Sequence, residues 1–503
     1  MKKSILKLDS IMIVAAGLIA IVIAIAFQGG VLSENLSFQN AYLVMAQQEN
    51  SSNTTGTNSE IKDLVEAAID NSTYYTIKNA TTPAVVTDPN TGTIYAVYFR
   101  NENGGGNIYL QKSSDNGQTF SQPVRINDKE GSVQLDAQWS PPAIGVGPSS
   151  QVYAVWYNAD HSEPDKYPFR QVTLRFARSL DGGNTFEPAI NPAPNDPKGE
   201  QSYPYMVVSD KNKIYISYLN LDYSKIDDPT GTPTVVRMVT SADGGKTFDN
   251  SAITDKSACQ CCATVSAINP VDGEIYTSSR SALKNGSIAL SNETRTDYMN
   301  QVQDLAVIRD VTVEHSTDKG IAQSFSQPVQ VNDDRWFMNG CPDAGPGMAF
   351  DSKGRLHIAW FTGSETGADG QGFYYASSDD QARTFTEPVP IHLLSEQWIP
   401  PTTQYLATDA YDNSWIVFVN SEGLEKSPTY EEDFSFQGNG TVQLAIVDRD
   451  GNVIRNGPFA SGDITKHYPY TSGVNGRIAL SWIDGDDVKL AFIDTSKRGQ
   501  TLI

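Results

Sequence analysis

The chain has 503 residues, of which 39% are hydrophobic and 10% aromatic. This composition excludes a disordered protein and predicts a folded core. The formal net charge of −22 argues against nucleic acid as a partner, because a basic surface is needed to neutralise phosphates.

The N-terminal segment predicts export. Basic residues at Lys2, Lys3 and Lys7 precede 17 apolar residues from Ile11 to Phe27. That length is at the short end of what spans a bilayer, and the preceding charges place the N-terminus in the cytoplasm. Residues 1–27 are therefore interpreted as a membrane anchor, with a cleaved signal peptide as the alternative. We expect a single-pass protein with an extracellular domain, or a secreted protein if the signal is cleaved.

Residues 28–72 are interpreted as a polar linker that can carry glycans. Asn, Ser, Gln and Thr dominate much of this stretch, and such residues bury little apolar surface. The chain also has eight N-x-S/T sequences, which in an exported protein are glycosylation acceptors. They lie at Asn35, Asn50, Asn53, Asn71, Asn79, Asn285, Asn292 and Asn439.

A motif of the form S-x-D-x-G-x-T-F recurs at intervals of about 60 to 75 residues. Ungapped copies begin at Ser113, Ser179 and Ser241, and looser copies begin at Ser316 and Ser377. In such a motif Asp and Ser can bond the backbone of a tight turn, Gly can supply a positive φ, and Phe can pack between sheets. The motif aspartates are therefore expected to be structural: Asp115, Asp181, Asp243, Asp318 and Asp379.

Short alternating strands flank each motif, at about four strands per repeat. This pattern predicts an all-β fold, a β-propeller of four-stranded blades over residues 73–503. Seven innermost strands begin near Pro83, Pro142, Pro204, Thr264, Pro346, Gln404 and Pro469, so seven blades are favoured, with six as the alternative. The last unit has three strands, and we expect the N-terminal segment 73–79 to close it as the outer strand.

The motif resembles the Asp box, or BNR repeat, of the sialidase (neuraminidase) superfamily. The resemblance covers about residues 73–503. It implies a propeller with the Asp boxes on one face and the active site on the other. It does not by itself imply sialidase activity, because binding and structural proteins share the box.

Residues in the links between blades and in the loops after the second strands are expected around the axis of the face opposite the boxes. Aromatic and acidic residues at such an opening suit sugar binding. The candidate ligand-binding residues are Arg100, Arg280, Arg335, Trp139, Tyr203, Trp336, Trp398 and His467.

Two functions follow from this arrangement. The favoured one is an exported, membrane-anchored module that recognises a glycan or protein ligand at the cell surface. The alternative is a sialidase-like glycoside hydrolase. The resemblance implies an arginine triad on a carboxylate, a Tyr nucleophile and an Asp acid, with candidates Tyr468, Tyr470, Asp136 and Asp160. The family's first arginine lies ahead of the first box, where this chain has "TTPAV". Neither function requires a cofactor.

The four cysteines suggest a third function. Cys259, Cys261 and Cys262 fall in the link before the fourth blade, and Cys341 falls in the next link. Exported thiols usually pair, and the pairing Cys259–Cys262 with Cys261–Cys341 is favoured as the least strained. The alternatives are a Cu or Zn site, which would make this a metal or redox protein, and a catalytic thiol.

Overall fold

The structure is a computed structural model, and the residues that it describes are 58–102, 105–134, 140–160, 171–225, 234–284, 307–318, 321–338, 343–364, 370–394, 405–420, 424–428, 436–464, 469–474 and 476–496. The chain divides into two compact units, Met1–Ile61 and Lys62–Ile503. Within the described residues no helix is both long and apolar enough to span a bilayer. The expected anchor, residues 11–27, lies outside them.

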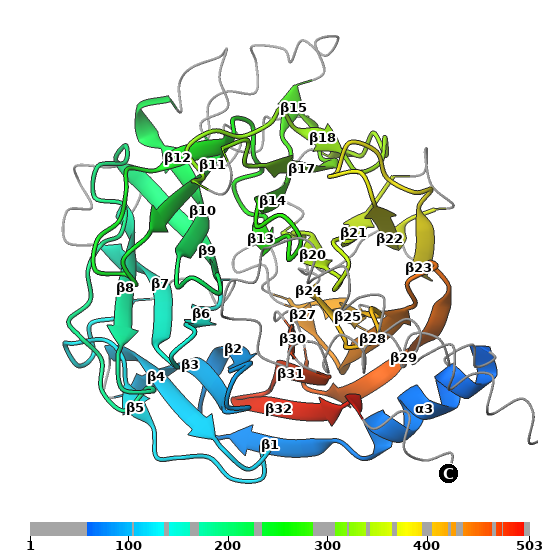
Figure 1. Cartoon of the computed structure of the whole chain (residues 1–503), viewed down its shortest axis with the longest axis horizontal. Coiled ribbons are helices and arrows are strands. Elements are labelled where there is room, and N and C mark those ends of the chain that lie inside the picture. The colour runs from blue at the N-terminus through cyan, green and yellow to red at the C-terminus, as the bar shows by residue number, and fades with distance from the viewer. Residues whose placement is uncertain are drawn as a thin grey trace, which may run out of the picture. The chain divides into compact units, whose positions relative to one another are not determined.

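The second unit is built from antiparallel sheets arranged in a ring (Figure 1). In chain order, the first sheets contain β2 (Thr81–Thr87), β3 (Ile94–Glu102), β4 (Gly105–Ser113) and β5 (Val124–Arg125), then β6 (Ala143–Val146), β7 (Val152–Asp160) and β8 (Gln171–Ser179), then β9 (Gly199–Val208), β10 (Ile214–Asp222), β11 (Thr234–Ser241) and β12 (Ala252–Asp255). The last two groups join into one seven-stranded sheet through a single parallel pairing, Val172 with Glu200. A 3-10 turn, Tyr223–Lys225, follows β10.

The remaining sheets complete the ring. They contain β13 (Val265–Ile268), β14 (Ile275–Arg280), β17 (Val311–His315) and β18 (Val329–Gln330), then β20 (Gly347–Phe350), β21 (Leu356–Thr362), β22 (Gly372–Ser378) and β23 (Val389–Leu393), then β24 (Tyr405–Thr408), β25 (Ser414–Asn420), β28 (Gly440–Val447) and β29 (Val453–Gly462), then β30 (Tyr470–Val474), β31 (Arg477–Asp484) and β32 (Asp487–Asp494). Smaller pairings join β15 (Leu283–Lys284), β16 (Val307–Ile308) and β19 (Phe337–Met338), and also β26 (Glu425–Lys426) and β27 (Phe436–Gln437).

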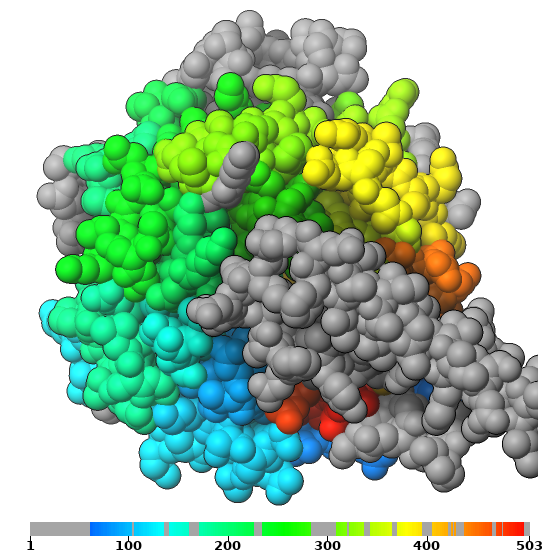
Figure 2. Space-filling model, viewed as in Figure 1, coloured from blue at the N-terminus to red at the C-terminus, as the bar shows by residue number. Residues whose placement is uncertain are grey.

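The inner strands meet around the ring. Among the described residues, β2, β6, β9, β13, β20, β24 and β30 contact one another in this order, and β30 contacts β2. Buried side chains pack between neighbouring sheets, for example Tyr153 and Phe176 against Ile214. The space-filling view of the same face shows the surface of the sheets from β2–β5 to β20–β23 (Figure 2). The second strands are almost entirely buried, for example β21 and β25. A β-propeller architecture places such apolar strands between neighbouring sheets.

The last sheet contains β1 (Thr73–Ile77) as its outer strand, antiparallel to β32. The N-terminal segment therefore completes a sheet whose other strands come from the end of the chain. Tyr75 packs on Phe120 at 4.5 Å between ring centroids, which joins β1 to the first Asp box. Lys78, just after β1, forms an ion pair with Asp487 at 2.7 Å.

Part of the segment that the sequence analysis interprets as polar linker is helical. Helix α3 spans Asn58–Asp70. Its apolar residues recur at helical spacing, and Val65 and Ile69 are buried. Glu66 pairs with Arg455 at 3.2 Å. The polar stretch therefore gives way to ordered structure before residue 72.

The Asp boxes follow the third strands and close tight turns. In the box after β8, Asp181 accepts hydrogen bonds from the N–H and the hydroxyl of Thr185, at 2.9 and 2.7 Å. Ser179 accepts one from the N–H of Gly183, whose φ is +80°. The Thr185 hydrogen bonds lower the pKa of Asp181 to about 2. The boxes of Asp115 and Asp243 repeat this pattern.

The two looser boxes differ from the sequence interpretation in one case. Asp318 accepts hydrogen bonds from three backbone N–H groups, those of Ala322, Gln323 and Ser324, which accommodates its longer turn. In the other copy the box carboxylate is Asp380 and not Asp379. Asp380 accepts from the N–H and hydroxyl of Thr384, and the box aligns without a gap from Ser378.

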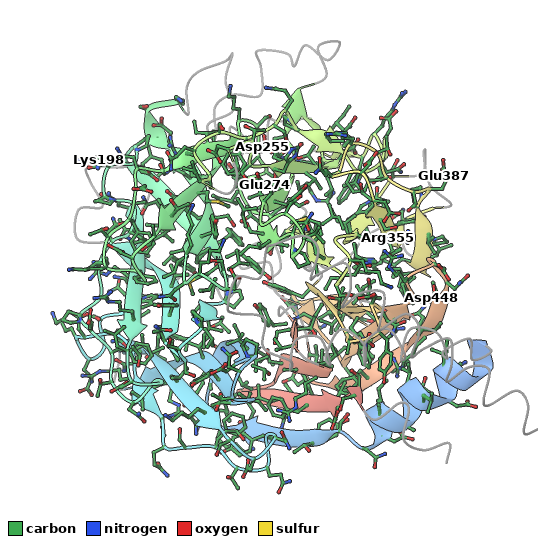
Figure 3. The ribbon with its side chains drawn as sticks, viewed as in Figure 1. Lys198, Asp255, Glu274, Arg355, Glu387 and Asp448 are labelled. Carbon is green, nitrogen blue, oxygen red and sulfur yellow. The ribbon has the colours of Figure 1, made fainter. Side chains whose placement is uncertain are left out.

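The correction has a physical reason. Ala382 takes the glycine position at φ +60°, which hides the match from a search for Gly. Asp379 is exposed and forms an ion pair with Arg355, a residue labelled in Figure 3. The neighbouring carboxylates therefore have different roles, one in the turn and one on the surface.

We expect Asp380→Ala to lower the free energy of unfolding by about 1–2 kcal/mol, because it removes hydrogen bonds to a tight turn. Asp379→Ala is the matched control and should change it by less than about 1 kcal/mol, since it removes an exposed ion pair. The pKa of Asp380 is lowered to about 2, so its contribution is present above the unfolded pKa near 4 and is lost as pH falls towards 2. Urea titrations of both variants at pH 7 and pH 3 measure this, and equal losses at pH 7 would contradict the assignment.

Candidate functional site

The links into the blades lie at the opposite end of the sheets from the Asp boxes. The first and third strands of an antiparallel blade run in the same direction. The boxes follow the third strands, so the starts of the first strands are at the other end. Residues in the links and at the ends of the second strands therefore share one face, where the candidate residues are expected.

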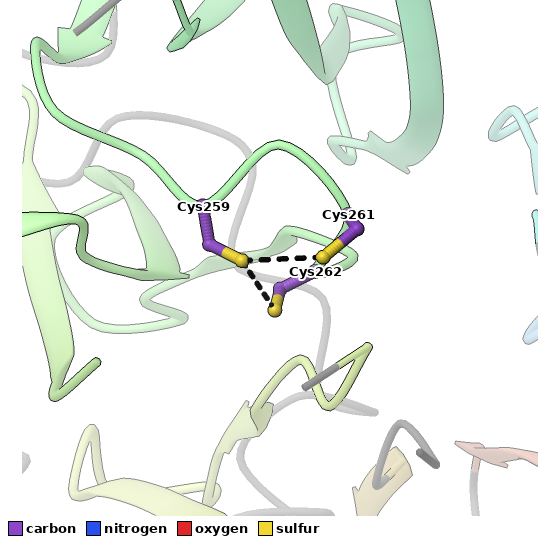
Figure 4. A group of neighbouring side chains, drawn as sticks. All are labelled: Cys259, Cys261 and Cys262. Carbon is purple, nitrogen blue, oxygen red and sulfur yellow. Dashed lines mark hydrogen bonds between the residues drawn. The ribbon is translucent and has the colours of Figure 1, made fainter. Parts of the chain in front are cut away.

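Three cysteines cluster in the link before β13 (Figure 4). The Sγ atom of Cys259 lies 2.8 Å from that of Cys262 and 3.5 Å from that of Cys261. All three side chains are buried, and their sulfur atoms lie within 4.8 Å of one another. The N–H of Cys259 donates to the carbonyl of Arg280 at 2.8 Å, which holds the link against the end of β14.

The cysteines differ in oxidation state. Cys261 is disulfide-bonded, whereas Cys259 and Cys262 are free thiols. The expected Cys259–Cys262 bond is therefore wrong for this structure, although the two sulfurs are close. Cys341 lies outside the described residues. The spacing of the three sulfurs suits one Cu or Zn ion, but the disulfide at Cys261 leaves two thiols where three thiolates would be needed, so the cluster as it stands does not fit that site.

Two arginines set the electrostatics of the cluster. Burial raises the pKa of the Cys259 thiol, but four interactions together lower it to about 6. They are the hydrogen bond from Cys262, the charge of Arg309, the N–H of Cys261 and the charge of Arg280. Burial and the contact with Cys259 raise the pKa of Cys262 well above its usual value. The pair is therefore asymmetric, with Cys259 as the thiolate and Cys262 as the thiol that stabilises it.

Arg280 is wholly buried and its guanidinium is occupied by the protein. Nε donates to the carbonyl of Ala344 at 2.8 Å, and Nη2 donates to that of Phe361 at 2.7 Å. Nη1 donates to the carbonyl of Arg309, and the ring of Trp336 lies 4.8 Å from Cζ. The expectation that Arg280 binds a ligand is therefore corrected: it joins β14 to the segments on either side.

The other two candidate arginines also have protein partners. Arg335 is exposed and pairs with Asp333 at 2.9 Å. Arg100, at the end of β3, donates to the carbonyls of Lys78 and Asn79 at 3.0 and 3.1 Å. Among the described residues, the hydrogen bonds and ion pairs of these two guanidinium groups involve none of the three carbonyls that Arg280 binds, although Asp310 acts on both Arg335 and Arg280. The structure does not bring them together as a carboxylate-binding triad.

The candidate nucleophile Tyr470 lies in a buried group of tyrosines. Its ring is 4.7 Å from that of Tyr405, and its hydroxyl is hydrogen-bonded to Tyr205. Burial and these neighbours raise the pKa of Tyr470 well above its usual value. A nucleophilic tyrosine needs the opposite shift or an adjacent base, so the structure assigns Tyr470 a packing role.

Two further candidates line the same face. Tyr203 donates from its hydroxyl to Asp343 at 3.4 Å, and burial raises its pKa. Trp336 packs edge-on against Phe361, with ring centroids 5.3 Å apart. The remaining candidates lie outside the described residues: Asp136, Trp139, Trp398, His467 and Tyr468. Asp160 is the last residue of β7, and the structure does not describe the position of its side chain.

A cavity of about 240 Å³ opens at the start of β2, beside the end of β3. Its lining includes Asn79, Thr82, Phe99, Arg100 and Asn101. Thr82 has a φ of +46°, which is unusual for a β-branched residue, and a β-bulge interrupts β2 at this point. The buried Thr82 Oγ1 has no hydrogen-bond partner among the described residues. Strained backbone conformations cluster at functional sites, and a buried hydroxyl without a partner calls for an explanation, so we take this cavity as a candidate binding site.

Sequence reasoning missed several of these residues. Arg309 is not among the candidates, although it follows the apolar pair of β16 and its charge acts on Cys259. Thr82 and Phe99 are also missed. Nothing in a single sequence distinguishes a strained threonine in a bulge from an ordinary strand residue, so only Arg100 was found in this cavity.

The comparisons with known proteins support the fold. No protein-family model and no curated protein matches the chain. Among solved structures, an ulvan lyase of a new polysaccharide lyase family, bound to -[GlcA(1-4)Rha3S]-, is 11% identical over 84% of this chain and 95% of that chain, with a TM-score of 0.51. At this identity the likeness shows a shared fold.

Two more distant structures belong to other glycan-acting proteins. A Hadza microbial sialidase is 12% identical over 77% of this chain and 73% of that chain, with a TM-score of 0.42. An α-L-arabinanase from Penicillium chrysogenum, complexed with arabinobiose, is 12% identical over 84% of this chain and 99% of that chain, with a TM-score of 0.43.

Proposed function

We propose that this protein is an exported, seven-bladed propeller that recognises an anionic glycan at the cavity beside β2 and β3. The N-terminal segment, residues 1–27, would hold it at the cell surface. The observation that carries the proposal is that Arg100 and Thr82 line one cavity, and that the buried hydroxyl of Thr82 has no hydrogen-bond partner among the described residues.

The cavity offers the groups that sugars bind. Arg100 is fixed by two backbone carbonyls through Nε and Nη2, while its Nη1 has a contact of 3.5 Å to Glu102. That distance exceeds the usual hydrogen-bond range, so Nη1 can donate to a ligand carboxylate or sulfate. Phe99 supplies a ring face, and the amide of Asn101 supplies a partner for a sugar hydroxyl. Preorganisation of the guanidinium reduces the entropy lost on binding.

The choice of an anionic glycan has support from the fold relative. The ulvan lyase was solved with a chain of glucuronic acid and sulfated rhamnose. Because the net charge of −22 repels polyanions, we expect a short oligosaccharide whose single acidic group is held by Arg100, and not a long polyanion that covers the surface.

The alternative, a glycoside hydrolase, has less support. Tyr470 is buried with a raised pKa, and the described arginines do not converge. Binding without turnover is therefore the function that the described geometry supports best. Release of reducing ends from a bound oligosaccharide would instead support the enzyme.

We expect the full-length protein to bind a glucuronic-acid oligosaccharide in calorimetric titrations, and Arg100→Gln to weaken binding about 10- to 100-fold, because a charged hydrogen bond is lost. Asn101→Ala should also weaken binding, and it leaves the Arg100 contacts to the backbone intact. Arg125→Gln, on β5 of the same sheet with its own partner Glu130, is the matched control and should bind normally.

Two results would contradict this proposal. One is equal affinity for the uronic-acid oligosaccharide and its neutral, carboxyl-reduced counterpart. The other is unchanged binding by both Arg100→Gln and Asn101→Ala when circular dichroism shows that both variants are folded.

A further inference from the structure

The sheet of β9–β12 and the sheet of β13, β14, β17 and β18 meet partly through polar side chains. The apolar residues at this interface form two small clusters, one with Tyr215 of β10 and one with Leu219 of β10. Ser217 lies between these two residues on the same face of the strand, because side chains alternate along a strand. It is buried and accepts a hydrogen bond from Ser266 of β13 at 2.8 Å. Polar contacts therefore occupy a position that an apolar core would normally fill.

Five oxygen-bearing side chains meet further out in the same interface. The register of β14 and β17 places Thr277 opposite Glu314 and Ser279 opposite Thr312, and residues two apart on a strand share a face. Asp255, at the end of β12 in the neighbouring sheet and labelled in Figure 3, reaches this face, where Ser279 Oγ donates to its Oδ2 at 2.8 Å. All five side chains are buried.

The two carboxyl groups have no cationic partner in the part of the chain that the structure describes. Asp255 accepts hydrogen bonds only from Ser279 and from backbone N–H groups, such as that of Ser257 at 2.9 Å. Glu314 Oε2 accepts a long hydrogen bond from Thr277 at 3.4 Å, and the buried Oε1 has no hydrogen-bond partner among the described residues. The charge of Asp255 also acts on Glu314. Two neighbouring carboxylates in an interior are strongly unfavourable unless something neutralises them.

We propose that Asp255 and Glu314 bind one calcium ion between the two sheets, with the hydroxyl oxygens of Thr277 and Ser279 as further ligands. Calcium takes six to eight oxygen ligands and accepts carboxylates together with neutral oxygens. A hydroxyl that donates to a carboxylate still has lone pairs for a cation. The two carboxylates balance the charge of a divalent ion exactly where the structure offers no arginine or lysine.

The chemistry of the ligands selects calcium over other metals. The five side chains offer only oxygen, whereas Zn and Cu favour sites with nitrogen or sulfur ligands. Magnesium demands compact octahedral geometry and keeps several waters, which suits an open site better than a buried interface. The ion would join β12 to β14 and β17. The site shares no residue with the cavity beside β2 and β3, so it does not rest on the proposed glycan recognition.

The test is thermal unfolding of the full-length protein in calcium and in the chelator EGTA, together with elemental analysis. We expect one calcium ion per chain after dialysis against calcium and removal of free ion. Calcium at about 100 times its dissociation constant should raise the Tm by about 3–5 °C over the value in EGTA, because the ion binds the folded state. Magnesium at the same concentration should raise it by less than half as much.

Glu314→Gln keeps the shape of the side chain and removes its charge. It should weaken calcium binding in calorimetric titrations at least about 10-fold, because one of two anionic ligands is lost. In EGTA the variant should melt above the wild-type protein, since an uncompensated buried charge is removed. Asp351→Asn is the matched control: Asp351 is buried but pairs with Arg449 at 2.7 Å, so this variant should melt lower and keep the calcium response.

Three results would overturn the proposal. The first is a wild-type protein that contains no calcium and melts at the same temperature in calcium and in EGTA, which would mean that protonation of Glu314 suffices. The second is a calcium response that persists in Glu314→Gln, as expected if the ion binds the acidic surface. The third is an equal response to magnesium. If Glu314→Gln does not fold, Ser279→Ala keeps both carboxylates and should still weaken calcium binding; unchanged affinity would count against the site.

Discussion

Arg280→Met is expected to lower the free energy of unfolding by about 3–5 kcal/mol, one of the two largest effects that we predict. The guanidinium donates to three backbone carbonyls, those of Arg309, Ala344 and Phe361. Methionine fills similar volume and donates to none of them. Each buried carbonyl left without a partner costs about 1–3 kcal/mol. The contact with the Trp336 ring is lost as well.

Urea denaturation followed by tryptophan fluorescence measures the effect. Arg335→Met is the matched control, because its side chain is 71% exposed and its ion pair with Asp333 is on the surface. It should change the free energy of unfolding by less than about 1 kcal/mol. If the two variants have the same denaturation midpoint, Arg280 does not join the sheets as we infer. It would then again be a candidate ligand-binding residue.

The sequence predicts the repeating architecture because its signals are local. An Asp box is a turn whose hydrogen bonds join residues four apart, such as Asp181 and Thr185, so eight letters contain most of the relevant chemistry. The alternation of the flanking strands is equally local. The one wrong assignment, Asp379 in place of Asp380, also has a local cause. Ala382 adopts a positive φ at the position where the motif has glycine.

The roles of the arginines could not be predicted in the same way. Arg280 and Arg100 look alike in sequence, since one is the last residue of a second strand and the other lies two residues before the end of a second strand. One is buried among carbonyls from distant segments, and the other reaches a cavity that a β-bulge and a strained threonine create. Such differences depend on tertiary partners that no spacing reveals.

The cysteines lie between these cases. Clustering of Cys259, Cys261 and Cys262 follows directly from their spacing, and the structure has them within 4.8 Å. Which sulfur is in a disulfide is not given by the spacing, and the structure has it at Cys261. The sequence therefore predicts that the three cysteines lie together but not which of them are thiols.

Removal of β1 is expected to have the other large effect. A chain that begins at Lys78 should lose on the order of 5 kcal/mol of unfolding free energy and aggregate, whereas a chain that begins at Ser72 should stay monomeric. The strand contributes five pairings with β32, the buried Ile77 and the contact of Tyr75 with Phe120. Without it, the β32 edge is exposed as a template for pairing with another chain.

The comparison isolates β1 because both shortened chains lack α3, and the ion pair of Lys78 with Asp487 can form in each. Light scattering and urea titration on the two chains measure association and stability. A monomeric chain from Lys78 with the same denaturation midpoint as the chain from Ser72 would show that the ring does not depend on its N-terminal strand. Closure would then have to come from contacts between the inner strands, β30 with β2.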